Sequence, residues 1–412
     1  MSEATIFENA RLFDGLSREP RDGMHVEVVG ERVARVSETP IPGAVVRRID
    51  LAGRTLMPGL IDAHVHAVAA TPNLGLLDAM APSLVAQYAR RFLEAALLRG
   101  FTTLRDAGGA DHGLATAIDR GLIRGPRLFY SGRALTQTGG HADLRGTDER
   151  LDICPCCQGS FVFGRIADGV DAVRAAARDE LRKGASQIKI MASGGVSSPS
   201  DPIWVLQYSL GELRAAVEEA AAFRTYVMAH AYTAEAIARC VEQGVRSIEH
   251  GNLIDAPTAR TVREAGAIVV PTLVTYHALE ESGAEQGFPP ESVAKIASVK
   301  AAGLEAVALL RAEGVPLGFG TDLLGEMHVH QGREFLIRRE VEAPVDTLLS
   351  ATAVNAALLN RTGELGCVAE GALADLIVVD GDPLADIGLL AGQGEALSVI
   401  MKGGRTVKCT LA

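Results

Sequence analysis

Several features of membrane-bound or secreted proteins are missing from this sequence of 412 residues. No apolar run is long enough to cross a bilayer, and Met1-Ser2-Glu3-Ala4 does not resemble the start of a secretory signal. The six cysteines include Cys154, Cys156 and Cys157, which are crowded too tightly to form a disulfide framework. We therefore expect a cytoplasmic protein with reduced thiols and no membrane partner.

The sequence also lacks a block of basic residues. It contains 40 lysines and arginines against 51 aspartates and glutamates, which gives a mild formal charge of -11. Binding to a phosphate backbone requires clustered positive charge, so we expect no nucleic-acid partner. Hydrophobic residues make up 48% of the chain, which is enough for a large soluble core.

Short apolar segments alternate with longer amphipathic ones through the middle of the chain. The expected strands are residues 58–66, 101–107, 127–132, 187–193, 226–232, 247–251, 267–273 and 316–322. Helical spacing lies between them, as in residues 82–99, 170–183, 211–223 and 233–243. Eight strands, each followed by a helix, predict an α/β fold with a (β/α)8 TIM barrel over residues 58–360. A segment rich in glycine and cysteine, residues 133–168, interrupts it.

The two ends of the chain have a different pattern. Residues 1–57 and 361–412 contain short β-like runs separated by turn residues. Neither end has enough strands for a stable core of its own. We therefore expect one small, discontinuous β-sandwich domain built from both termini.

The most informative motif is His64-Val65-His66, which ends the first expected barrel strand. Side chains at positions i and i+2 of a strand point to the same side, so both imidazoles are aimed together. Neutral imidazole nitrogens suit a borderline metal ion such as zinc. On its own the motif could equally be two polar residues at a strand end.

Other chemically active residues lie at the ends of further expected strands. They are Lys189, His230, His250 and Asp322. The carboxyl ends of barrel strands meet at one face, which is where barrel enzymes carry their functional residues. One buried histidine is usually a hydrogen-bonded core residue, but four histidines, a lysine and an aspartate at one level predict a metal site.

Lys189 is unusual because it stands inside the apolar run Ile188-Lys189-Ile190-Met191. Burying an ammonium is costly, and desolvation lowers its pKa. A neutral amine can react with carbon dioxide to form a carbamate, which would bridge two cations as a carboxylate does. Two alternatives are that Lys189 points outward from the barrel or that it pairs with Asp106.

Together these motifs resemble the amidohydrolase superfamily, in particular its binuclear-metal branch with a carboxylated lysine. The resemblance rests on His64-Val65-His66, Lys189 before Ile-Met-Ala-Ser-Gly-Gly, His230, His250 in Ile-Glu-His-Gly, and Asp322. It implies His64, His66 and Asp322 on one divalent cation, His230 and His250 on the other, and Lys189 as an N6-carboxylysine between them. Zinc is the expected metal, although the ligand atoms also suit manganese and cobalt.

Three further stretches resemble the prolidase-like dipeptidases of this superfamily: residues 138–141, 191–196 and 230–233. This implies hydrolysis of Xaa-Pro dipeptides or N-acyl-L-amino acids such as N-acyl prolines, by attack of a hydroxide that bridges the two metals. Asp322 would carry the proton to the leaving nitrogen. His141 and Tyr232 would stabilise the carbonyl oxygen or bind the substrate carboxylate. Relatives are often octameric, so the resemblance implies a homo-oligomer.

Two alternative functions remain open. Relatives of similar layout hydrolyse aryl amides such as ochratoxin A, or carbamates and phenylureas, and a wide pocket behind residues 133–168 would favour such substrates. The third hypothesis is a non-catalytic scaffold, which usually lacks several ligands, whereas all six are present here. Further candidates for the pocket, without a role that the sequence decides, are His112, His277, His328, His330, Arg145, Arg165 and Arg333. Cys154, Cys156 and Cys157 could bind a third metal ion, but a second pair of ligands is missing, which favours a reduced loop segment.

Overall fold

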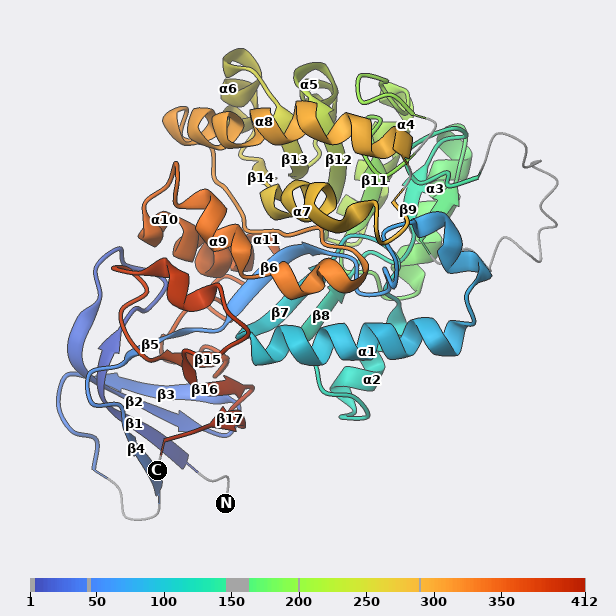
Figure 1. Ribbon diagram of the computed structural model, residues 1–412. Coiled ribbons are helices and arrows are strands. Elements are labelled where there is room, and N and C mark those ends of the chain that lie inside the picture. Colours follow the sequence, from blue (N-terminus) through green and yellow to red (C-terminus); the bar gives the residue numbers. More distant parts are fainter. Residues whose placement is uncertain (1–3, 43–45, 146–162, 199–200, 289, 412) are drawn as a thin grey trace.

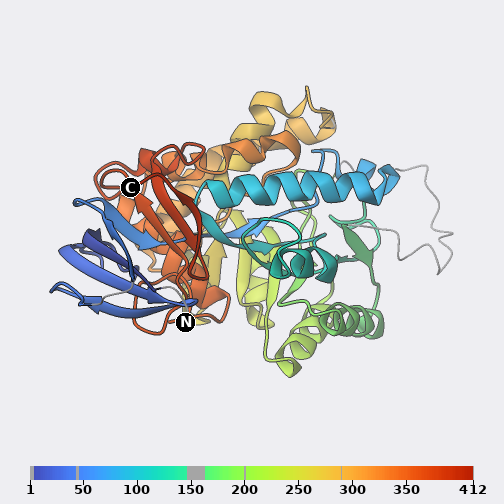
Figure 2. The same cartoon turned by 90° about the horizontal axis from the view of Figure 1, so that it is seen from below.

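The computed structural model describes residues 4–42, 46–145, 163–198, 201–288 and 290–411. Two parts are visible in Figure 1: a β-sheet that contains both ends of the chain, and an α/β part whose strands are surrounded by helices. Figure 2 shows the sheet packed against one end of the α/β part. No helix in the described part of the chain is long and apolar enough to span a bilayer.

The terminal sheet has eight strands in the order β17-β16-β15-β5-β1-β2-β3, with β4 paired to β1. Its strands are β1 (Ala4–Leu12), β2 (Arg21–Val29), β3 (Arg32–Ser37), β4 (Val46–Asp50), β5 (Thr55–Pro58), β15 (Leu376–Val379), β16 (Leu397–Lys402) and β17 (Arg405–Cys409). β15 from the C-terminal end pairs antiparallel with β5 from the N-terminal end. The two ends therefore build one sheet, as expected, but the sandwich of two sheets is not confirmed.

The α/β part contains two parallel sheets. One has three strands, β6 (Leu60–Val65), β7 (Phe101–Asp106) and β8 (Arg127–Tyr130). The other has six strands in the order β10-β9-β11-β12-β13-β14. These are β9 (Ala134–Thr136), β10 (Gly164–Ile166), β11 (Ile188–Met191), β12 (Val227–Thr233), β13 (Ser247–Leu253) and β14 (Ile268–Val270). A closed eight-stranded barrel is not confirmed by these strands.

The expected eighth strand, residues 316–322, is not a regular strand. Leu317 forms an isolated parallel bridge with Val269. The segment nevertheless bonds on both sides: Gly318 N donates to Val269 O at 2.8 Å, and Ala63 N donates to Phe319 O at 2.8 Å. Gly320 is packed so closely that a Cβ there would lie 2.7 Å from His64 Cβ. Because of its glycines and this close packing, the segment does not adopt regular strand geometry. It still forms backbone hydrogen bonds with β14 on one side and β6 on the other.

The helices surround the parallel strands (Figure 1). They are α1 (Pro82–Leu98), α2 (His112–Asp119), α3 (Val170–Arg182), α4 (Leu210–Ala222), α5 (Ala234–Glu242), α6 (Ala256–Glu264), α7 (Leu273–Ala278), α8 (Pro290–Ala312), α9 (Arg333–Arg338), α10 (Pro344–Leu349) and α11 (Asn355–Leu358). Local signals fix several starts: Ser209 and Glu212 form a capping box at α4, and Thr233 caps α5.

Most strands of the α/β part are buried on both faces, whereas β8 and β10 are partly exposed. All residues of β6, β7 and β11 are buried, including His64, Arg105 and Lys189. Helices cover the outer face of these strands, and the inner faces pack against one another in the core. The apolar residues of these strands therefore pack on both sides. The polar residues inside this core must therefore find partners or ligands.

Candidate metal centre

One enclosed cavity at the carboxyl ends of the parallel strands collects the residues that the sequence singled out. Its volume is about 30 Å³. Its wall includes all of the expected ligands and catalytic residues, namely His64, His66, His141, Lys189, His230, Tyr232, His250 and Asp322. Leu74, Phe163, Met191 and Leu324 supply apolar wall. The convergence follows from parallel strands that end at the same level.

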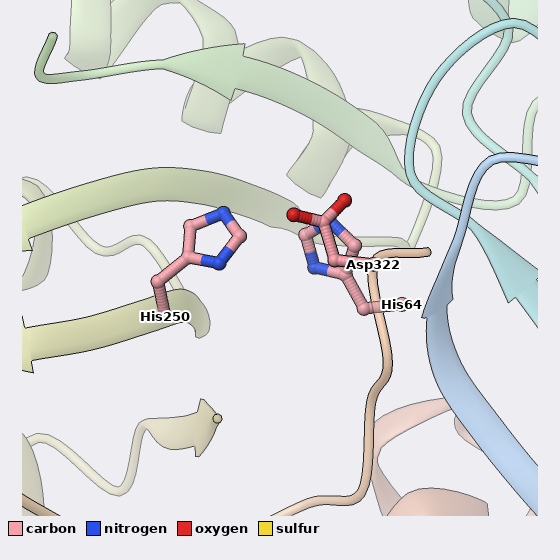
Figure 3. Close-up of side chains that lie close together, drawn as sticks. All are labelled: His64, His250 and Asp322. Atoms are coloured by element: carbon pink, nitrogen blue, oxygen red, sulfur yellow. The ribbon is translucent and has the colours of Figure 1, made fainter. Parts of the chain in front are cut away.

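The ligand atoms lie close enough to share a metal ion. His64, His250 and Asp322 each place one ligand atom within 4.8 Å of the others (Figure 3). His66 Nε2 lies 3.1 Å from Asp322 Oδ1, and His64 Nε2 lies 3.5 Å from the same oxygen. The rings of His230 and His250 have centroids 4.6 Å apart. How these residues divide between two ions stays a prediction.

Two of these residues have an unusual backbone conformation. The φ angles of His250 and Asp322 are 74° and 52°, in the left-handed region that non-glycine residues seldom adopt. Asp322 N donates to His64 O at 2.8 Å, which holds this conformation next to β6. Such backbone geometry persists where the surroundings enforce it, and it is concentrated at functional sites.

Hydrogen bonds on the outer ring nitrogens fix how the imidazoles face the cavity. His64 Nδ1 lies 2.6 Å from Glu249 Oε2, His66 Nδ1 lies 3.0 Å from the Gly108 carbonyl, and His250 Nδ1 lies 2.7 Å from Thr272 Oγ1. Each Nε2 is then left to accept. His64 Nε2 is buried and has no hydrogen-bond partner in the described part of the chain. A metal ion would satisfy this nitrogen, so the residues fit the expected cofactor.

The protonation states of these side chains also suit metal binding. Burial lowers the pKa of His64 and of His230 well below the ordinary value, and it lowers the pKa of His250 to about 3. Burial alone would raise the pKa of Asp322, but the adjacent His64 and His66 lower it below the ordinary value. The site therefore holds neutral imidazoles and an ionised carboxylate, which are the forms that bind cations.

These shifts predict that the metal-free protein loses stability in mild acid. Folding keeps three histidines neutral, while the unfolded chain binds protons below a pKa of about 6.5. Stability should therefore fall as the pH drops below about 6.5, by roughly 2 kcal/mol for each buried histidine at pH 5. Urea unfolding between pH 8 and pH 5 tests this. In the His230→Gln variant the loss of unfolding free energy at pH 5 should be smaller by roughly 2 kcal/mol, the contribution of one buried histidine. A loss equal to that of wild type would contradict the assignment of His230 as a buried neutral imidazole.

Lys189 lines the same cavity and is 1% exposed. Its amine makes no hydrogen bond or ion pair within the described residues, and burial lowers its pKa from 10.5 to about 8. Asp106, the alternative partner, instead accepts hydrogen bonds from the backbone N–H groups of Ala67, Gly108 and Ala110. Both alternatives for Lys189 are therefore wrong: the side chain faces inward and is not paired with Asp106.

A buried charge network beneath the site was not predicted. Arg105 Nη2 donates to both oxygens of Glu249, at 2.9 and 3.0 Å, and Glu249 in turn contacts His64. Ser247 Oγ also donates to Glu249, at 2.5 Å. Arg105 and Glu249 are completely buried, so each neutralises the other. Glu249 thereby holds His64 in the tautomer that leaves Nε2 for a metal.

Glu249→Gln is expected to weaken metal binding about 10- to 100-fold, because an uncharged amide no longer fixes the His64 tautomer. It should also lower the free energy of unfolding by about 3–5 kcal/mol, because Arg105 loses its buried counter-charge. Metal titration and urea unfolding measure the two effects. Glu264→Gln, at an exposed glutamate of α6, is the matched control. Unchanged metal affinity in Glu249→Gln would contradict this role.

His141 is held at the cavity by residues that the sequence did not reveal. Its Nδ1 lies 3.1 Å from Asp201 Oδ2, and its backbone N–H donates to Gln207 Oε1 at 2.9 Å. Gln207 also donates to Asp201, at 3.0 Å. Lys295 of α8 donates to the carbonyls of Gly195, Ser198 and Asp201, which anchors this loop. His141 is thus oriented with Nε2 toward the cavity.

Tyr232 stacks on His250, with ring centroids 5.1 Å apart and planes at 17°. Its hydroxyl lies 2.9 Å from the Tyr276 hydroxyl. Burial raises the pKa of Tyr232 well above its ordinary value, so the hydroxyl stays protonated and can donate. Tyr276 is a further polar side chain near the cavity that the sequence gave no reason to select.

The remaining candidates do not line this cavity. His112 contacts Thr116 on its own helix. Arg145, Arg165 and Arg333 pair with Asp143, Asp179 and Glu281. His277 and His330 are partly buried elsewhere, and His328 stacks on Phe92. Cys154, Cys156 and Cys157 lie outside the described residues.

Comparisons with known proteins identify the family of this chain. The model of the amidohydrolase family matches residues 55–406. The ochratoxinase of Aspergillus niger is 33% identical over 332 residues, which cover 78% of this chain and 68% of that protein. Its crystal structure is 30% identical, with a TM-score of 0.86, and covers 99% of this chain and 96% of its own.

Two crystal structures are more similar. One is of an amidohydrolase, with 50% identity and a TM-score of 0.97 over 99% of this chain and all of the other. The other is of a prolidase complexed with N-methylphosphonate-L-proline, with 50% identity, a TM-score of 0.96 and the same coverage.

Proposed function

This chain belongs to the amidohydrolase family, and from that premise we propose that it hydrolyses the amide bond of Xaa-Pro dipeptides and N-acyl-L-prolines. The family and its prolidase relatives support a hydrolase that acts on carbon–nitrogen bonds. The observation that carries the proposal is the convergence of His64, His66, Lys189, His230, His250 and Asp322 on one cavity.

One observation favours proline-containing substrates over large aryl amides. The crystal structure of the prolidase complex is 50% identical to this chain, whereas the crystal structure of the ochratoxinase is 30% identical. Leu74, Phe163 and Met191 give the cavity an apolar wall, against which a proline ring would pack.

The metal ions would be held by the six residues assigned from the resemblance. We propose His64, His66 and Asp322 for one ion, His230 and His250 for the other, and Lys189 in carboxylated form between them. Zinc is the expected ion, since nitrogen and oxygen ligands suit it. Bound divalent ions activate water as a nucleophile near neutral pH and polarise a carbonyl group.

Asp322 would act as the general base and acid. Its carboxylate is ionised and lies beside His64 and His66 at the centre of the cavity. It would take the proton from the attacking water and give it to the leaving nitrogen. An amide nitrogen leaves poorly as an anion, so this transfer is needed for the bond to break.

His141 and Tyr232 would bind the oxygen atoms of the substrate. His141 pairs with Asp201 through Nδ1, and in its doubly protonated form it would donate from Nε2 to the developing oxyanion. The protonated Tyr232 hydroxyl can donate to the same oxygen or to the proline carboxylate. Leu74, Phe163 and Met191 would pack against the substrate and exclude water from the cavity.

To test this, the metal-loaded protein is given five kinds of substrate and hydrolysis of each is measured. They are Xaa-Pro dipeptides, N-acyl prolines, ochratoxin A, a carbamate and a phenylurea. We expect proline release from the first two at rates far above those for the others. Preferred hydrolysis of ochratoxin A would support the aryl-amide alternative. No release of proline from any dipeptide or N-acyl proline would refute the substrate assignment.

We also propose that residues 1–57 and 361–412 form one domain, that residues 58–360 form a barrel completed by residues 316–322, and that the protein is a homo-oligomer, with an octamer as the expected form. Light scattering on a size-exclusion column measures the assembly. A monomer at micromolar concentration would refute that part.

A further inference from the structure

A second, separate cavity lies between α1, the loop after β6 and the 3-10 helix Gly325–His330. Its volume is about 280 Å³. It shares no lining residue with the metal cavity. A water molecule occupies roughly 30 Å³ of the liquid, so this space is large enough for a small organic ligand.

The cavity contains a buried arginine with an incomplete set of partners. Arg99, at the C-terminal end of α1, is 3% exposed. Its Nε donates to Gln331 Oε1 at 3.1 Å, and its Nη1 donates to Gln393 Oε1 at 3.0 Å. Its Nη2 is buried and has no hydrogen-bond partner among the described residues.

The partners that Arg99 does have are neutral amides. No carboxylate of a described residue forms an ion pair with Arg99. Burial lowers its pKa to about 10, and the Asp62 carboxylate, which lies behind Gln331, opposes that shift. Buried charges are normally paired, because an uncompensated one is costly. The guanidinium therefore has a positive charge without a direct counter-ion and an N–H group without an acceptor among the described residues, and an anion would satisfy both.

The rest of the wall limits what this anion can be. Alanines 67, 69, 70 and 95 and the ring of Phe92 make much of the wall apolar. His328 stacks on Phe92 with centroids 3.7 Å apart, and both of its ring nitrogens are buried, so this residue adds ring surface to the wall. At the rim, Arg91 is already paired with Glu326.

We propose that this cavity binds a small organic carboxylate on Arg99. One carboxylate oxygen would accept from the Arg99 guanidinium, and the apolar body would pack against Phe92 and the alanines. The single negative charge of a carboxylate balances the single positive charge of the Arg99 guanidinium. A phosphate dianion would leave one negative charge in the cavity without a counter-charge. A cation is disfavoured because the one acidic wall residue, Glu326, already pairs with Arg91.

Arg99 also connects this cavity to the residues beneath the metal centre. Gln331, which accepts from Arg99, donates from Nε2 to Asp62 Oδ2 at 2.9 Å. Asp62 in turn accepts from the backbone N–H of His64, at 3.1 Å, and from Thr321 Oγ1, at 2.6 Å. An anion on Arg99 would thus contact the same buried network that positions His64, whatever substrate the enzyme hydrolyses.

The test uses 4-bromobenzoate as the probe with the full-length, metal-loaded protein. Titration calorimetry gives the affinity, and the anomalous signal of bromine in a crystal gives the location. We expect bromine in the cavity beside Phe92 and binding at least tenfold weaker in Arg99→Met. Ala95→Leu fills the cavity but leaves Arg99 and its amide partners in place, so it should weaken binding even if Arg99→Met fails to fold.

Two controls make the result specific. Arg90→Met removes an exposed arginine of the same helix, which pairs with Glu94 outside the cavity, and should leave binding unchanged. The neutral 4-bromobenzamide should bind at least tenfold more weakly than the carboxylate. Equal affinity in wild type, Arg99→Met and Ala95→Leu would overturn the proposal. So would bromine at the metal centre alone, or a carboxylate of a second copy of the chain occupying the cavity.

Discussion

Replacing Lys189 with methionine is expected to abolish most hydrolysis and, at the same time, to stabilise the metal-free protein. Lys189 is 1% exposed, and its amine has no hydrogen-bond or ion-pair partner among the described residues. Burying a polar group without a partner costs free energy of folding. The presence of Lys189 here is explained if its amine has a role in the reaction. Methionine has a similar length and no charge, so it removes that penalty without leaving a large void.

The two effects can be measured separately. Without a bridging carbamate the site should bind its metals poorly, and kcat should fall at least about 10³-fold, as for the loss of a residue that organises the reacting groups. The free energy of unfolding of the metal-free protein should rise by about 1–3 kcal/mol. Lys300→Met, at a surface lysine paired with Glu280, is the control for both. A Lys189→Met enzyme that remains active, or a metal-free variant less stable than wild type, would contradict the account.

The second large effect is expected for Asp322→Asn. An amide side chain cannot accept the proton from water and return it to the leaving nitrogen, so kcat for an amide substrate should fall about 10²- to 10⁴-fold. A 4-nitrophenyl ester of the same acyl group should be less affected, because nitrophenolate leaves without a proton. The comparison separates proton transfer from a general disturbance of the site.

Metal content must be measured alongside, because Asp322 is also an expected ligand. Asp171→Asn, at an exposed aspartate in the first turn of α3, should leave both substrates unaffected. If Asp322→Asn retains its metals and loses the ester and amide activities equally, Asp322 acts as a ligand and not as a proton carrier.

The sequence predicted residues that line one cavity, because their chemistry and their topology coincide. Parallel strands end at one level, so His66, Lys189 and His250, which are far apart in the chain, could be expected to meet. The resemblance to the amidohydrolases, which the family match confirms, pointed to the same positions. The helices were also predictable, because α3 and α4 have regular apolar spacing.

The supporting residues could not be identified in the same way. Glu249 and Arg105 each stand as a charged residue inside an expected strand, where a charge that becomes buried needs a partner. Their pairing across 144 positions, however, depends on how the strands are arranged in space. Asp201 lies in a loop whose spacing has no regular pattern, and its contact with His141 arises from the folded loop. Arg99 resembles any arginine at the C-terminal end of a helix until its partners are known.

The sheets differ from expectation for local reasons. Residues 316–322 contain a proline and two glycines, and Asp322 has a left-handed backbone, so hydrogen bonds to β6 and β14 form without a regular strand. At the termini, β1 pairs first with β4 and then with β5 across a register shift. This switch of partners gathers the terminal strands into a single sheet, which alternation of apolar residues does not reveal.

The central claim is that two divalent ions bind in the cavity with a modified Lys189 between them. Crystals of the protein loaded with zinc, with diffraction data collected on both sides of the zinc absorption edge, test it directly. We predict two anomalous peaks, one near His66 and one near His230, with carbamate density on Lys189 Nζ reaching both. A single peak or none, beside an unmodified lysine, would contradict the account.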